Sequence, residues 1–279
     1  MSQNVSHEHV EQREAVTIIN QGQKMFGVIH RPLQKGKRPA VLFCSGFAGT
    51  KFGKYRLFVK LSEELARRGI LSLRFDYRCT GDSEGNFQDA TFEGEVNDTI
   101  CALEYLADDP QVDLTQLALF GRSLGGAVAI LAAKRYQGIK SLVLWAPVFC
   151  ADEWKNLWEA SKTKKLDPFQ AQILKALPGQ VPNLQFLQEF FNIHIADTLI
   201  ALKDVPLLHL HGEIDSVVKI SHADGYKHSR ASSPNTRFIR LAHSDHDFGN
   251  TDDQKIAIAE TCDWLEKTLL GTKQAVGRQ

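Results

Sequence analysis

The stretch Leu117-Ala118-Leu119-Phe120-Gly121-Arg122-Ser123-Leu124-Gly125-Gly126 decides the fold. Its first four residues are apolar, as in a buried β-strand, and the residues after Gly125 are small and apolar, as in a buried helix. A serine with a glycine two residues away on each side, between such a strand and such a helix, is typical of a nucleophile elbow. Side chains at positions 121 and 125 would collide with neighbouring backbone in so tight a turn, so glycine is favoured there. We therefore expect the Ser123 hydroxyl to stand clear of the sheet.

The whole chain is 279 residues long, with 33 basic and 33 acidic side chains and no formal net charge. This length suits one large α/β domain or two small ones. The balanced charge argues against nucleic acid or an anionic membrane as a partner. Residues 1–14 are polar without an apolar centre, and no apolar run approaches membrane-spanning length. Five cysteines without a C-x-x-C pair fit buried thiols in a reducing compartment, so we expect a cytoplasmic protein.

Strand-like and helix-like segments alternate along most of the chain. The predicted strands are 15–20, 25–30, 39–45, 70–76, 117–121, 141–147, 206–212 and 236–241. Besides the helix after the elbow, the predicted helices are 55–68, 92–107, 217–231 and 252–270. The inner strands are apolar on both faces, which favours a mostly parallel eight-stranded sheet with helices on both sides, an α/β fold.

One stretch, 149–204, breaks this alternation because it holds no strand-like run. It carries aromatic residues at helical spacing, and we interpret it as a small helical cap insertion over the carboxyl ends of the strands, where ligands bind on an open sheet. The core then comprises 15–148 and 205–271, after a mobile tail at 1–14. The rings indicate an apolar substrate pocket, with Trp154, Trp158 and Phe190 as candidates. The alternative is that these rings only seat the cap on the core.

A serine hydroxyl is a poor nucleophile until a base takes its proton, and a carboxylate best orients that base. Asp215 follows the predicted strand 206–212 in a turn that opens a helix, so it is the candidate acid. Two histidines follow the last strand. His246 is preferred as the base because an aromatic residue follows it two positions later, before the final helix, and His243 is the alternative.

Each of these residues also has a plainer interpretation. A serine between two glycines is usually part of a turn, and an aspartate in such a position often caps a helix. The cluster of histidines and aspartates at 243–247 could form a metal site, but no third ligand has a convincing spacing, so we expect no metal and no cofactor. The joint placement of Ser123, Asp215 and His246 in the right order at the ends of elements favours a catalytic triad.

An acyl-transfer site must also stabilise an oxyanion. The strand 39–45 runs into a loop in which Gly46 lets the backbone approach the serine, so the backbone N–H of Phe47 is one candidate donor. The N–H of Leu124, at the start of the helix after the serine, is the second.

These features together resemble the α/β-hydrolase superfamily, and within it the cinnamoyl/feruloyl esterase-like and serine-aminopeptidase-like group. The resemblance rests on residues 45–49 (SGFAG), 74–85 (RFDYRCTGDSEG), 121–126 (GRSLGG) and 211–215 (HGEID) with His246. The chain departs from the group at Ser45, where a histidine is common, and at Arg122, where histidine or glutamate is common. Residues 149–204 contain no tyrosine, which argues against a hydroxycinnamate substrate.

The resemblance implies an α/β-hydrolase fold and a serine hydrolase that cleaves small to medium carboxylic esters through an acyl-enzyme. A small-molecule ester is then the expected partner, and a homodimer is left open. A peptidase or amidase with the same triad is one alternative, and its acidic candidates for holding a substrate ammonium are Asp152, Glu153, Glu159 and Glu189. A non-catalytic binding protein of the same fold is the other alternative, although such proteins usually lack a member of the triad.

Overall fold

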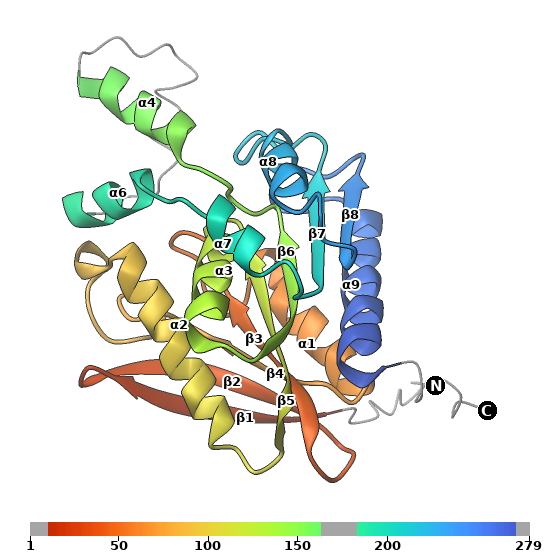
Figure 1. Cartoon of the computed structure of the whole chain (residues 1–279). Helices are drawn as coiled ribbons and strands as arrows, with labels where there is room; N and C mark the ends of the chain where they lie inside the picture. Colours follow the sequence, from red (N-terminus) through yellow and green to blue (C-terminus); the bar gives the residue numbers. More distant parts are fainter. Residues whose placement is uncertain (1–10, 163–182, 272–279) are drawn as a thin grey trace, which may run out of the picture.

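A computed structural model describes residues 11–162 and 183–271, and its centre is an eight-stranded sheet in the order β1-β2-β4-β3-β5-β6-β7-β8 (Figure 1). β1 pairs antiparallel with β2, β2 pairs antiparallel with β4, and every other pairing is parallel. The predicted mostly parallel α/β-hydrolase sheet is thus confirmed. The strands are β1 Glu11–Asn20, β2 Gln23–Pro32, β3 Arg38–Cys44, β4 Leu71–Phe75, β5 Val112–Arg122, β6 Ile139–Trp145, β7 Leu207–Gly212 and β8 Thr236–Leu241.

Helices cover both faces of the sheet, and β3 shows why. Successive side chains of a strand point to opposite faces, so Leu42 joins one hydrophobic core and its neighbours Val41 and Phe43 join the other. α2 and α3 pack over the first core, and α1 and α9 pack over the second (Figure 1). These helices are α1 Leu57–Arg67, α2 Phe92–Ala107, α3 Leu124–Tyr136 and α9 Thr251–Leu265, which a π-helical turn, Glu266–Leu270, continues.

Several predicted boundaries are wrong; β5, for example, begins at Val112 rather than at 117. β1 begins at Glu11, so residues 11–14 belong to a strand rather than to a tail, because they continue the pairing with β2 as far as Pro32. The predicted tail at 1–10 lies outside the described residues. The helix predicted over 217–231 is confined to α8, His222–Ser229, because the backbone of Val217 and Val218 is held in a turn by the side chain of Asp215.

Between β6 and β7 the described residues form three helices, α4 Asp152–Lys162, α6 Leu184–Phe191 and α7 Ala196–Ala201. α4 projects from the body beyond the end of β6 (Figure 1). Residues 163–182 of the predicted cap lie outside the described residues. Among the described helices, none combines the length and the apolar character needed to cross a lipid bilayer.

Asn183 attaches α6 to the core. Its Oδ1 accepts the N–H of Phe186 at 2.7 Å, which caps the helix, and its Nδ2 donates to the carbonyl oxygens of Gln88 and Ala90 at 2.6 and 2.9 Å. The buried ring of Phe186 packs edge-on against Phe47, with centroids 5.3 Å apart. The insertion therefore rests on the loop that follows β3.

Candidate active site

Ser123 lies between the end of β5 and the first residue of α3. Its backbone has φ 57° and ψ −124°, a conformation that a residue with a side chain keeps only where its surroundings impose it. Three backbone hydrogen bonds impose it here. The N–H of Ser123 donates to Trp145 at 2.9 Å, and its carbonyl oxygen accepts from Gly126 and Val148 at 3.0 and 3.1 Å. The elbow thus holds Ser123 in a single strained orientation.

The predicted need for glycine in this turn is confirmed. A Cβ on Gly121 would lie 2.4 Å from the carbonyl oxygen of Gly125, and one on Gly125 would lie 2.3 Å from that of Cys44. A Cβ on Gly46 would lie 3.0 Å from Cβ of Ser123 and 3.5 Å from its Oγ. The loop after β3 therefore comes as close to Ser123 as backbone allows.

The structure brings together the three side chains that the sequence predicted as a triad. Nε2 of His246 lies 3.1 Å from Oγ of Ser123, and its Nδ1 lies 2.7 Å from Oδ2 of Asp215. The His246 side chain is 12% exposed and Asp215 is buried. His243, the alternative base, is exposed and has no hydrogen bond to Ser123 or Asp215 within the described residues.

The two carboxylate oxygens of Asp215 have different partners. Oδ1 accepts the backbone N–H groups of Val217 and Val218, both at 2.8 Å, as the capping interpretation expects. Oδ2 faces His246 and also lies 3.4 Å from Nε2 of the buried His211, which contacts the carbonyl oxygen of Val218 at 2.7 Å. The capping interpretation and the histidine partner are therefore compatible.

The surroundings keep this carboxyl ionised. Burial opposes its ionisation, but the hydrogen bonds with His211 and His246 outweigh burial and hold the pKa of Asp215 well below its usual range. An ionised Asp215 favours the His246 tautomer that carries its proton on Nδ1. Nε2 is then left to accept the proton of the Ser123 hydroxyl, as a general base must.

Arg122 makes a contact that the sequence did not predict. Its Nη2 donates to the carbonyl oxygen of His246 at 2.8 Å and to Oδ1 of Asp247 at 2.5 Å. Oδ2 of Asp247 also lies 3.9 Å from Nζ of Lys54. The sequence signal was an arginine beside the serine, where the group commonly has histidine or glutamate. The sequence could not predict that Arg122 would contact His246 and Asp247, because these residues lie in a loop that is distant in the chain.

The two candidate oxyanion donors have unengaged backbone N–H groups. Phe47 follows Gly46 in the loop that approaches Ser123, and Leu124 opens α3. Within the part of the chain that the structure describes, neither N–H donates to an acceptor. Two such N–H groups on the segments beside a serine are what stabilisation of a developing oxyanion requires.

Of the three predicted substrate-binding residues, the structure brings two into contact. The rings of Trp154 and Phe190 lie 5.5 Å apart, and Trp158 lies one turn further along α4. Trp154 also packs on His222 of α8, with centroids 5.5 Å apart. Phe190 in turn contacts Phe186, so rings extend from the loop after β3 into the insertion. The row consists of Phe47, Phe186, Phe190 and Trp154.

The described residues contain neither a group of possible metal ligands nor a disulfide. Among residues 11–162 and 183–271, no three histidine, cysteine, aspartate or glutamate side chains are grouped as a metal site would need. All five cysteines are free thiols. Burial raises the pKa of Cys44, at the end of β3, to about 12, so that thiol stays protonated at neutral pH.

Comparison with known sequences points to the same superfamily. A family model described as serine aminopeptidase, S33, matches residues 35–197, more than half of the chain. The human mitochondrial palmitoyl-protein thioesterase ABHD10 is 26% identical over 242 residues, which cover 84% of this chain and 75% of the human protein. An uncharacterized protein of Mycobacterium tuberculosis is 35% identical over 136 residues, 48% of this chain. That match spans less than half of the mycobacterial protein, 45% of its length.

Solved structures share the fold across nearly the whole chain. Est1E from Butyrivibrio proteoclasticus, whose structure was determined with ferulic acid bound, superimposes with a TM-score of 0.74 at 20% identity, covering 92% of this chain and 100% of that one. The Pyrococcus furiosus esterase Pf2001 gives a TM-score of 0.71 at 17% identity, with 93% and 92% coverage. At these identities the likeness is one of fold.

Proposed function

The chain belongs to the serine aminopeptidase S33 family of α/β-hydrolases, and we propose that it hydrolyses small to medium carboxylic esters. The observation that carries the proposal is the hydrogen-bonded row from Ser123 through His246 to Asp215. A serine, an imidazole and a buried carboxylate in this row suit acyl transfer.

In the proposed reaction, Oγ of Ser123 attacks the ester carbonyl while Nε2 of His246 takes the hydroxyl proton. Asp215 stabilises the imidazolium, and the N–H groups of Phe47 and Leu124 hold the oxyanion. His246 then passes the proton to the leaving alkoxide. Water, activated by the same imidazole, attacks the acyl-enzyme and releases the acid.

Two contacts favour an ester over a peptide with a free amino terminus. An aminopeptidase needs unoccupied acidic groups to hold the substrate ammonium, but Oε2 of Glu189 accepts the backbone N–H of Glu93 at 2.9 Å. Glu153 forms an ion pair with Lys219 at 3.1 Å. Glu189 and Glu153 are thus already engaged.

A thioester is the second candidate substrate. The observation that favours it is the match to a palmitoyl-protein thioesterase over 84% of this chain. The same acyl-enzyme chemistry can expel a thiolate in place of an alkoxide, so the two substrates differ only in the leaving group.

The test compares turnover of p-nitrophenyl acyl esters from acetate to dodecanoate, the matching acyl thioesters, and aminoacyl p-nitroanilides. We expect ester turnover that falls at least about a thousandfold in Ser123→Ala and is unchanged in Ser232→Ala, an exposed control. A Ser123→Ala variant with wild-type turnover would refute the proposal. Preference for the anilides would favour a peptidase, and an inert wild type would favour a binding protein.

A further inference from the structure

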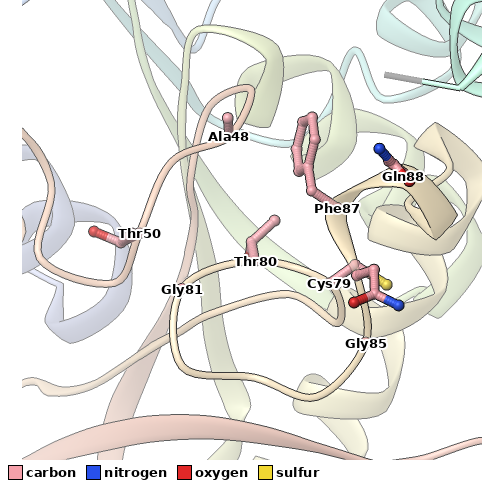
Figure 2. Close-up of a pocket in the computed structure, with 9 residues that line it drawn as sticks. Ala48, Thr50, Cys79, Thr80, Gly81, Gly85, Phe87 and Gln88 are labelled. Atoms are coloured by element: carbon pink, nitrogen blue, oxygen red, sulfur yellow. The ribbon is translucent and has the colours of Figure 1, made fainter. Parts of the chain in front are cut away.

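A cavity of about 660 Å³ lies between the loop after β3 and the loop after β4. Ala48 and Thr50 line it from the first loop, and residues 79–81 and 85–88 line it from the second. Figure 2 shows Ala48 and Thr50 on one side and Phe87 on the other, with Thr80 between them. None of the residues that line this cavity takes part in the reaction proposed above.

A single buried carboxylate ties the two walls of the cavity together. Oδ1 of Asp76, which directly follows β4, accepts the backbone N–H of Lys51 at 2.6 Å. Its Oδ2 contacts Nζ of Lys51 at 2.5 Å and accepts the N–H of Asp82 at 3.0 Å. Lys51 is adjacent to Thr50 and Asp82 is adjacent to Gly81, so each wall is bonded to Asp76. Separating a buried ion pair is costly, so the cavity is preformed.

The lining is polar and neutral. Thr80 is buried and donates its hydroxyl proton to the carbonyl oxygen of Tyr77 at 3.0 Å, which leaves its oxygen able to accept. The side chains of Thr50 and Gln88 have no hydrogen-bond partner within the described residues, so each can donate and accept. No charged residue lines the cavity. A charged ligand would therefore find no counter-charge among the lining residues, and an alkyl chain would leave the buried hydroxyl oxygen of Thr80 without a donor.

The cavity shares a wall with the candidate reaction centre. Gly46 of the loop after β3 lies against Ser123, and the loop is closed by a hydrogen bond from Gly49 N to the Gly46 carbonyl oxygen at 2.8 Å. The ring of Phe87 packs edge-on against Phe47, with centroids 5.5 Å apart. One short loop therefore carries the Phe47 N–H and, through the next residues, lines the cavity.

We propose that this cavity is a subsite for a neutral, hydroxyl-bearing part of the ester, with Thr80 and Gln88 as specificity-determining residues. The inference rests on the proposed ester hydrolysis, because it places the substrate carbonyl at Ser123. The hydroxyl groups can belong to a polyol alcohol or to a hydroxylated acyl group. Both would pair with the threonine and glutamine side chains.

The experiment compares kcat/KM for glyceryl monobutyrate, propyl butyrate and propyl 3-hydroxybutyrate. The first two differ only in hydroxyl groups on the alcohol, and the third moves a hydroxyl to the acyl side. We expect the wild type to prefer one hydroxylated ester, which identifies the side that enters the cavity. Thr80→Val and Gln88→Leu are each expected to reduce the ratio of kcat/KM for that hydroxylated ester to kcat/KM for propyl butyrate roughly 3- to 10-fold, the value of one hydrogen bond. Thr17→Val, on the exposed face of β1, is the matched control.

Ligand binding to Ser123→Ala, followed by nuclear magnetic resonance, separates the subsite from the reaction. If wild type cleaves propyl butyrate without preferring either hydroxylated ester, the proposed function stands and the subsite is refuted. Variants that slow all three esters equally also refute the subsite. If wild type cleaves no ester, yet Ser123→Ala binds glyceryl monobutyrate more weakly once Thr80→Val is added, the subsite stands and the proposed function fails. Absence of both turnover and binding refutes both.

Discussion

Nη2 of Arg122 donates a hydrogen bond to the carbonyl oxygen of His246 across 2.8 Å, although 124 residues separate the two in the chain. Arg122 immediately precedes Ser123, so this bond ties the elbow directly to the loop that carries His246. We therefore expect the separation between Nε2 of His246 and Oγ of Ser123, 3.1 Å, to depend on a side chain that touches neither atom.

Replacing Arg122 is expected to lower kcat while leaving KM and the melting temperature nearly unchanged. Misplacing a reacting group by about 1 Å can cost roughly 100-fold in rate, so we expect a fall of roughly 10- to 100-fold in Arg122→Met. Arg122→Lys retains a donor and is expected to recover part of the loss. Ester hydrolysis and thermal unfolding are measured side by side, with Arg135→Met as the matched control. Equal kcat in Arg122→Met and wild type would contradict a positioning role.

The ionised carboxylate of Asp215 is expected to stabilise the fold at neutral pH and to lose this effect in acid. Asp215→Asn should remove the contribution. The partners of Asp215 hold its pKa below the unfolded value, so the ionised group stabilises the fold above about pH 4, and this contribution is lost as the pH falls further. The difference in free energy of unfolding between wild type and Asp215→Asn should be constant above about pH 5 and shrink below about pH 4. Urea denaturation across this range measures it, with the surface variant Asp224→Asn as control. A difference that does not change with pH would refute the expectation.

His209 is expected to make the fold less stable as the pH falls below neutrality. It is buried in β7 among the rings of His211, Tyr226 and Phe238, and burial lowers its pKa well below the usual value. The unfolded chain then binds the extra proton below about pH 6.5, which costs the fold up to about 1.4 kcal/mol per pH unit.

His209→Phe keeps a ring of similar shape and removes the titration. Its free energy of unfolding should therefore fall less than that of wild type between about pH 7 and pH 5. Chemical denaturation at both pH values measures this, and the exposed His228→Gln serves as control. If the free energy of unfolding falls equally in wild type and His209→Phe, groups other than His209 cause the pH dependence.

Gly125→Ala is expected to destabilise the chain far more than an alanine elsewhere in a turn. The new Cβ would lie 2.3 Å from two carbonyl oxygens, those of Cys44 at the end of β3 and of Ser45 directly after it. Gly22→Ala is the control, because its Cβ would meet nothing within 4 Å and carries only the cost of a positive φ, about 1 kcal/mol. Urea denaturation compares the two. Equal losses would mean that the elbow relaxes to accept the side chain.

Several features of the site could be predicted because they are encoded within a few neighbouring residues. Alternating and continuous apolar runs indicated the strands and helices, and the steric need for glycine at 121 and 125 marked the elbow. The choice of His246 over His243 followed from its place before the last helix. The first four residues of β1, Glu11–Glu14, were not predicted as strand because they are polar. Only their pairing with β2 places them in the sheet.

The sequence by itself thus determined the order of the elements, the tight turn at Ser123 and the identities of Asp215 and His246. Only the tertiary structure decided that Arg122 reaches the His246 loop, that Asn183 anchors the insertion at Gln88, and that Asp76 joins the walls of a neutral cavity. Local steric and apolar patterns act between residues that are close in the chain. These three contacts depend on where separate loops meet at the edge of the assembled sheet, which is set by the strand order.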